Sequence, residues 1–109
     1  MATDKGYIGY NGARPLATGR APQHIQNLVI RDYCRRHDLA FKLSASEYAM
    51  PHCYMMLNKL VEEISQHNGI VMYSMFMLPA RGVRRRALYR RILGAGASLH
   101  AAVEDLALA

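Results

Sequence analysis

The pattern of apolar and polar positions predicts strands that alternate with helices. The clearest strand covers residues 69–75, where the run is almost continuously apolar and stops shortly before Pro79. A continuous apolar run, unlike an alternating one, is typical of a strand in a parallel sheet that has helices on both faces. We expect three further strands, over residues 6–10, 39–44 and 97–103.

Three helices are expected between these strands. The first begins at Pro22, where the missing N–H costs little, and runs to about Arg36. The second shows apolar side chains at a spacing of 3.6 residues and ends before Asn68-Gly69. The third covers about 81–94. The expected core stripe of the first helix is Ile25, Leu28, Val29 and Tyr33, and that of the second is Cys53, Leu57, Leu60, Val61 and Ile64.

The order of these elements predicts one open α/β domain over residues 1–109, with a flexible amino terminus at 1–5. Parallel strands are joined almost always by right-handed crossovers. We therefore expect a four-stranded parallel sheet of order 2-1-3-4, with helices on both faces, in a Rossmann-like arrangement. Ligands of such sheets bind beyond the carboxyl ends of the strands, where the strand order reverses. That position lies here between the first and third strands.

Composition limits the classes of partner. The chain carries a formal net charge of +6, which favours anionic partners such as nucleic acid, phosphorylated metabolites or a membrane surface. The alternative is a basic face that only contacts solvent. No run reaches the roughly 20 apolar residues of a membrane span, and no signal-peptide core is present. Because Cys34 and Cys53 lack metal-site spacing, we expect no metal, and a reduced, cytoplasmic protein.

The loop before the first helix offers candidates for binding an anion. Arg14 and Arg20 flank a glycine-containing segment that leads into the amino terminus of the helix, and this combination suits a phosphate or carboxylate. Gln23 and His24 lie in the first turn. His24 is a candidate acid or base near neutral pH. The alternatives are solvated loop arginines and a surface histidine.

Candidates also follow the later strands. Ser46, Glu47 and Tyr48 come after the second strand, and Glu47 is the leading candidate for a general base, with Tyr48 beside it. The alternative for Glu47 is a helix-capping or ion-pairing role. Ser74 and Glu104 end the third and fourth strands and are candidate ligand-binding residues. The methionines and tyrosines show no cofactor spacing, so we expect no cofactor.

With these elements placed, the chain resembles the catalytic domain of serine recombinases, the resolvases and invertases. The likeness rests on Gly6-Tyr7, Gln23, Gln26, the run 69–73 before Leu78, and Gly96 with Leu99 and Glu104. The nucleophilic serine of that family and the arginine before it match Asn11 and Gly9. Its Asp-Arg pair and later arginine match Phe76, Met77 and Ala80. Without the nucleophile and its cations, phosphoryl transfer lacks both activation and charge stabilisation, so the chain is not expected to be an active recombinase.

The chain also resembles a small family from sporadic bacterial carbohydrate-biosynthesis gene clusters. The segments that carry this resemblance are 20–34, 46–51, 53–57, 73–74, 76–79 and 96–100. Ala13 and Ala80 depart from the serine and the acidic residue expected at those positions. The resemblance implies a role in surface-polysaccharide or modified-sugar synthesis and no established reaction. Whether the chain is an enzyme stays open; if it is, general acid/base chemistry on a sugar is implied.

These observations lead to one expected function and two alternatives. We expect a cytoplasmic protein that acts on an anionic sugar or nucleotide-sugar. The alternatives are a non-catalytic, recombinase-like protein that binds nucleic acid non-specifically, and a structural partner subunit. We also expect a homo-oligomer, because Phe76, Met77 and Leu78 would otherwise expose a contiguous apolar patch.

Overall fold

A computed structural model describes residues 5–12, 22–47, 53–79 and 82–108. Its sheet has five strands in the order β2-β1-β3-β4-β5. The strands are β1 (Tyr7–Gly12), β2 (Phe41–Glu47), β3 (Gly69–Met72), β4 (Ser98–Ala101) and β5 (Leu106–Leu108). The helices are α1 (Gln23–Arg36), α2 (Met55–Glu62) and α3 (Gly82–Gly94), with short 3₁₀ turns η1 (Ile64–Gln66) and η2 (Met75–Met77).

The order of the first four strands and their parallel pairing confirm the prediction, whereas the number of strands was wrong. A fifth strand, β5, pairs antiparallel with β4, and Leu99 faces Leu108 across the pair. The expected fourth strand, 97–103, ends at Ala101. A turn reverses the chain after Ala101. Asp105 adopts a left-handed conformation in this turn, with a φ of 54°. The sheet is therefore mixed.

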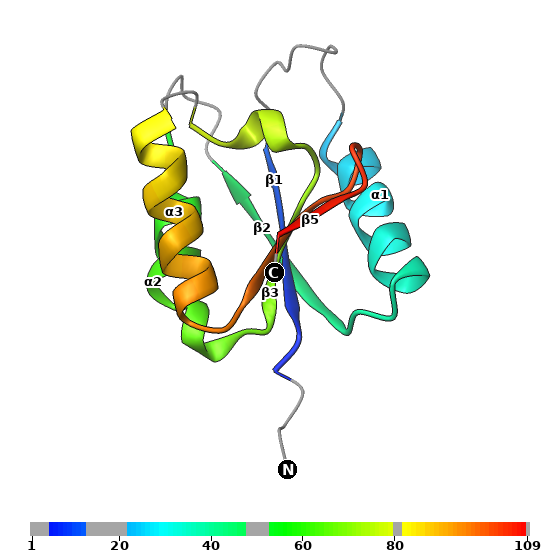
Figure 1. Ribbon diagram of the computed structural model, residues 1–109. Coiled ribbons are helices and arrows are strands. Elements are labelled where there is room, and N and C mark those ends of the chain that lie inside the picture. Colours follow the sequence, from blue (N-terminus) through cyan, green and yellow to red (C-terminus); the bar gives the residue numbers. More distant parts are fainter. Residues whose placement is uncertain (1–4, 13–21, 48–52, 80–81, 109) are drawn as a thin grey trace.

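The helices form two layers around the sheet. Figure 1 shows α1 on one face and both α2 and α3 on the other. The larger core lies on the α2–α3 side and includes Ile8, Leu57, Ile70 and Leu99, while Ile30 belongs to a smaller core under α1. This arrangement confirms the expected helices on both faces.

The inner face of α1 differs from the predicted stripe. Tyr33 is buried as expected, but Ile25 and Leu28 are exposed, with 40% and 60% of their surface accessible. The buried positions include Gln26 and Ile30 instead. The cause is the carboxamide of Gln26, which hydrogen-bonds to the backbone of the sheet and so requires a polar residue on the inner face.

Two further expectations are corrected by the structure. Ser46 and Glu47 belong to β2 itself, since the strand continues to Glu47. The segment after β3 does not expose a contiguous apolar patch, because Met77 and Leu78 are buried and only Phe76 is exposed. Met77 is the buried residue of the turn η2, and Leu78 follows directly after this turn. Its start is capped by the hydroxyl of Ser74, which accepts a hydrogen bond from the N–H of Phe76.

Candidate functional site at the carboxyl end of the sheet

The candidate site lies where β1, β2 and the amino end of α1 meet. Asn11 and Gly12 end β1, and the β1–β2 register places Asn11 directly opposite Ser46. The strand order reverses between β1 and β3, and open α/β sheets bind ligands in the crevice beyond the carboxyl ends of such strands. The end of β1 borders that crevice, and the site extends from it toward β2 and α1.

A chain of neutral polar side chains occupies this edge. The hydroxyl of Ser46 donates a hydrogen bond to the Oδ1 atom of Asn11 over 2.7 Å. The Nδ2 group of Asn11 donates in turn to the Oδ1 atom of Asn27, over 2.6 Å. Asn11 is buried, Asn27 is half-buried and Ser46 is exposed. The chain therefore leads from the end of the sheet to the surface.

A second amide fixes α1 against the end of β1. The side chain of Gln26 accepts a hydrogen bond from the N–H of Gly12 and donates one to its carbonyl oxygen. Gln26 is 1% exposed, so both of these bonds are shielded from water. A carboxamide satisfies one donor and one acceptor of the same backbone residue, as no carboxylate does. The clamp sets where the first turn of α1 stands relative to the sheet.

The first turn of α1 suits negative charge. Pro22 precedes the helix in an extended conformation and provides no side-chain cap, and the first turn contains no acidic residue. The N–H groups of Ile25 and Gln26 bond to the carbonyl of Pro22. The positive end of the helix dipole nonetheless remains at this point. Gln23 and His24 are exposed here.

Glu47 is too deeply buried to contact a ligand in the mouth of the site. It is 3% exposed, and its carboxylate accepts a hydrogen bond from the hydroxyl of Tyr10 at 2.8 Å. It also accepts from the N–H groups of Met56 and Leu57, both at 3.1 Å. The thiol of Cys53 lies 3.6 Å from the same carboxylate. These contacts hold the amino end of α2 and fit the capping alternative for Glu47.

Ser74 and Glu104 do come together, as partners of each other. The hydroxyl of Ser74 donates to one carboxylate oxygen of Glu104 over 2.7 Å, and the N–H of Met75 donates to the other over 2.9 Å. Ser74 is buried and Glu104 is half-buried. Their bonds tie η2 to the turn that follows β4.

Several predicted positions lie outside the described residues, namely Arg14, Arg20 and Tyr48. Among the described candidates, the structure brings Ser46 together with Asn11 and Asn27, and places Gln23 and His24 in the adjacent helical turn. Asn27 was not among the predicted site residues. Its spacing of four residues from Gln23, which places both polar side chains on one face of the helix, could have indicated it.

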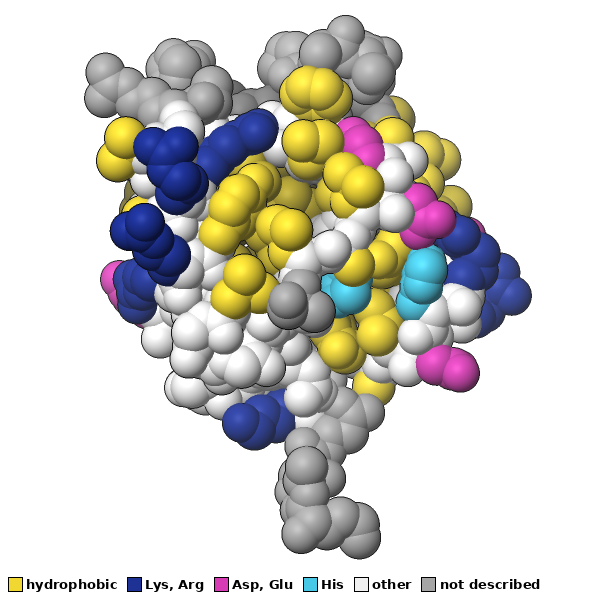
Figure 2. Space-filling model, in the orientation of Figure 1, with side chains coloured by type: hydrophobic (Ala, Val, Ile, Leu, Met, Phe, Trp, Pro, Cys, Tyr) yellow, Lys and Arg dark blue, Asp and Glu magenta, His cyan; other side chains and the backbone are white. Residues whose placement is uncertain are grey.

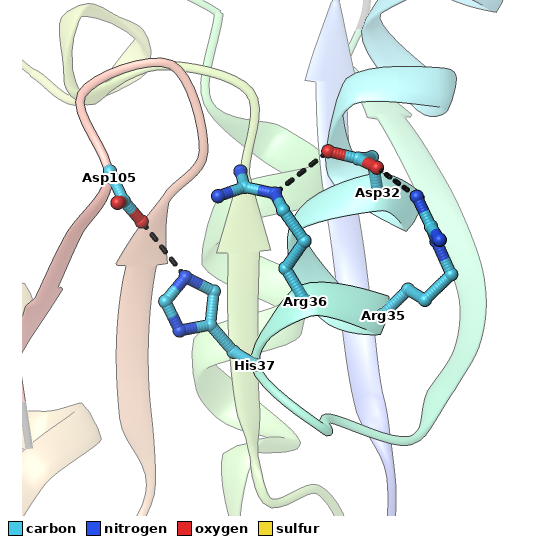
Figure 3. Close-up of polar contacts among 5 residues, drawn as sticks. All are labelled: Asp32, Arg35, Arg36, His37 and Asp105. Atoms are coloured by element: carbon cyan, nitrogen blue, oxygen red, sulfur yellow. Dashed lines mark hydrogen bonds and ion pairs between the residues drawn. The ribbon is translucent and has the colours of Figure 1, made fainter.

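Figure 3 shows a charged cluster at the other end of α1. The carboxylate of Asp32 accepts from Arg35 at 2.6 Å and from Arg36 at 2.8 Å, and these hydrogen bonds hold the pKa of Asp32 below its ordinary value. His37, just after the helix, lies 2.9 Å from Asp105. That contact joins α1 to the turn before β5.

Near this cluster lies a hydrogen-bonded series of three side chains, Tyr33, His100 and Ser98, which we call the relay. The hydroxyl of Tyr33 and the Nδ1 atom of His100 are 2.8 Å apart, and the Nε2 atom of His100 is 2.8 Å from the hydroxyl of Ser98. Burial, and then the neighbouring His37, lower the pKa of His100. Burial also raises the pKa of Tyr33. The relay therefore favours neutral side chains and joins β4 to α1.

The described part of the chain contains no group of three or more His, Cys, Asp or Glu side chains that could hold a metal ion. Both cysteines are buried and free. Cys53 packs beside Glu47, as a core position would, and burial raises the pKa of Cys34. None of the helices in the described segments combines the length and apolar composition of a membrane crossing.

Comparison with known proteins gives a likeness in structure. No family model and no curated protein matches the chain. Among solved structures, it is similar to a resolvase-family site-specific recombinase from Streptococcus pneumoniae, with a TM-score of 0.68 and 9% sequence identity. The match covers 93% of this chain and 75% of that chain. At this identity the likeness concerns the fold alone. The resemblance to the carbohydrate-cluster family stays a prediction, and what the comparisons show is a distant, resolvase-like α/β fold.

Proposed function

We propose that the chain binds an anionic sugar or a nucleotide-sugar at the carboxyl end of β1 and β2, as part of carbohydrate biosynthesis. The observation that carries the proposal is the hydrogen-bonded series Ser46–Asn11–Asn27 beside the first turn of α1. The proposal extends the sequence resemblance to the carbohydrate-cluster family. It is supported by the position of the series at the carboxyl end of β1, which borders the reversal of strand order between β1 and β3.

The chemistry of the series suits a hydroxylated ligand. A carboxamide offers two donors and an acceptor oxygen, and a hydroxyl can both donate and accept. Asn27 and Ser46 reach the surface with part of this capacity, while the buried Asn11 fixes both of them. Sugar hydroxyls need the same mixture of donors and acceptors. Side chains held in place beforehand lose less freedom when a ligand binds.

The amino end of α1 favours a ligand with negative charge. The dipole of a 14-residue helix ends at Gln23, and no acidic side chain in the first turn competes for it. The net charge of +6 increases the local concentration of anions. Arg14 and Arg20, which the sequence places in the loop before α1, are also proposed to bind the anionic group. His24 is exposed in the same turn, and it is the described catalytic candidate that is accessible to a ligand.

The recombinase position of Asn11 supports binding without strand exchange. The resemblance assigns the nucleophile to this position, where the chain has a carboxamide engaged with both Ser46 and Asn27. A carboxamide is no nucleophile for a phosphodiester. We expect no covalent adduct with supercoiled DNA, and the appearance of one would contradict this part of the proposal.

Calorimetric titration with UDP-glucose, GDP-mannose and glucose phosphates tests the proposal. Ser46→Ala and Asn27→Ala each remove a neutral hydrogen-bonding group, worth about 0.5–1.5 kcal/mol, so each should weaken binding about two- to ten-fold. Asn58→Ala is the matched control, because Asn58 is an exposed amide on α2. Its affinity should equal that of the parent. Absence of binding by the whole panel, or equal affinity in all variants, would contradict the proposal.

A second candidate function is non-specific binding of nucleic acid. Arg84, Arg86, Arg90 and Arg91 are exposed on α3, and Figure 2 shows Lys and Arg side chains along this side of the molecule. Arg85 differs from them, since its guanidinium donates to the carbonyls of Pro79 and Met75. Binding carried by these arginines should weaken steeply as salt is added. Loss of DNA binding in Arg86→Ala with Arg90→Ala, and no loss in Ser46→Ala, would favour this function.

A further inference from the structure

The two edges of the sheet differ in how well they are protected. The described strand at one edge, β2, carries Lys42 and has a register irregularity against β1. The strand at the other edge, β5, is Leu106-Ala107-Leu108 and carries no charge or proline. Exposed edges are normally protected, because their unpaired backbone groups accept a further strand. With three residues β5 is short, but it has neither a charge nor a proline that would prevent pairing with another strand.

The leucines of β5 extend an apolar face that α3 leaves open. In the β4–β5 register, Leu108 lies opposite Leu99 and Leu106 opposite Ala101, so these four side chains point to the α3 side. Leu106 is 50% exposed and Leu108 is 41% exposed. In Figure 2, apolar side chains gather around a hollow between α3 and β5. The hollow has a volume of about 220 Å³, and its lining includes Met72, Met75, Leu78 and Tyr89.

The turn before β5 holds this strand ready for pairing. The N–H groups of Ala102 and Val103 bond to the carbonyls of Met72 and Tyr73, and that of Asp105 bonds to the carbonyl of Ala102. The side chain of Asp105 contacts His37 from the end of α1. An ordered edge strand loses little freedom when it binds another strand.

From these observations we infer that β5 pairs antiparallel with β5 of a second copy of this chain. An antiparallel pair of identical strands is related by a two-fold axis, so one edge meets itself without any second complementary surface. The pairing joins two five-stranded sheets into one. It brings Leu106 and Leu108 of both copies into a single apolar row and covers the unprotected edge. This inference does not depend on the sugar site, which lies at the other side of the sheet, by β1 and β2.

Charge distinguishes a second copy from other occupants. Among the described residues, no Asp, Glu, Lys or Arg side chain lines the hollow, so an apolar partner fits it. Each copy has a net charge of +6, so two copies repel one another, and added salt screens that repulsion. Self-association should therefore hold or strengthen with salt. An anionic partner at the same surface would dissociate instead.

Sedimentation equilibrium of the parent and two single variants tests the inference. Leu106→Lys and Leu108→Lys add the charge that protects natural edges, and each should raise the dimer dissociation constant by at least about ten-fold. The matched control is Leu43→Lys, which changes an exposed leucine on the opposite edge strand β2 and should leave the dimer intact. Circular dichroism checks that each variant is folded.

Two results would overturn the inference. One is a parent that stays monomeric at about 100 μM; if that monomer binds an apolar dye in a Leu106-dependent way, the hollow is a small-molecule pocket. The other is a dimer that Leu43→Lys dissociates while the β5 variants do not.

Discussion

The contacts of Glu47 predict a large loss of stability from the exchange of a single heavy atom. Glu47→Gln keeps the size of the side chain and replaces one acceptor oxygen with an NH₂ group. In the parent, the carboxylate accepts from the hydroxyl of Tyr10 and from the N–H groups of Met56 and Leu57. The amide offers one oxygen to these donors and directs its own N–H groups toward them. At least one charge-assisted hydrogen bond is lost inside the protein.

The magnitude follows from the burial of the group. A hydrogen bond to a charged group contributes about 1.5–3 kcal/mol, and a buried donor left without an acceptor has a similar cost. With 3% exposure for Glu47 and 0% for Tyr10, water does not replace the lost partner. We expect the free energy of unfolding to fall by about 2–3 kcal/mol, out of the 5–15 kcal/mol typical of a domain. The urea midpoint should fall by about 1 M or more.

Urea unfolding followed by circular dichroism measures this change, and Glu62→Gln is the control. Glu62 is exposed in the last turn of α2, so its substitution should change stability by less than about 0.5 kcal/mol. Equal stability of Glu47→Gln and the parent would refute the capping role. If that variant also lost turnover of a sugar substrate, the general-base interpretation would be favoured instead.

Further predictions concern the relay and the glycines. Burial lowers the pKa of His100 in the folded protein. The neutral imidazole therefore contributes its full stability above the ordinary pKa of about 6.5, and this contribution falls as the pH drops toward the folded-state pKa. Between about pH 7.5 and 5.5, the urea midpoint should fall more in the parent than in His100→Gln. Gly69→Ala should destabilise by about 1–3 kcal/mol, because its Cβ atom would collide with the carbonyl oxygen of Ser98 and lie 2.9 Å from a ring carbon of Tyr7. In contrast, a Cβ atom added at Gly94 would have no other atom within 4 Å. Gly94→Ala should therefore stabilise α3 by about 0.4–1 kcal/mol, and a lower melting temperature would contradict this reasoning.

The sheet order was predictable because two independent patterns agreed. The apolar run at 69–75 indicated a buried parallel strand, and the handedness of crossovers left few strand orders. In contrast, β5 has three residues, too few to show a period, and the turn before it depends on the left-handed backbone of Asp105. Such a strand depends on contacts with β4 and not on its own sequence.

The candidate site was predictable in position and less so in detail. The reversal of strand order between β1 and β3 indicated the carboxyl end of β1, and Ser46, Gln23 and His24 lie on the β2 and α1 side of that end. The hydrogen-bond partners were not predictable, because they depend on the phase of α1. Gln26 faces the sheet and so turns Asn27 toward Asn11, whereas hydrophobicity alone predicts Ile25 and Leu28 on the inner face.

A titration of the ¹⁵N-labelled protein with UDP-glucose, followed by amide chemical shifts, tests whether a sugar binds at the carboxyl end of the sheet. Saturable shifts are expected at Gln23–Asn27, Asn11, Gly12 and Ser46, where β1, β2 and α1 meet. Ser46→Ala should reduce the affinity while the same amides still respond. Shifts confined to α3 or to β5, or no shifts at millimolar ligand, would contradict a sugar site at the carboxyl end of the sheet.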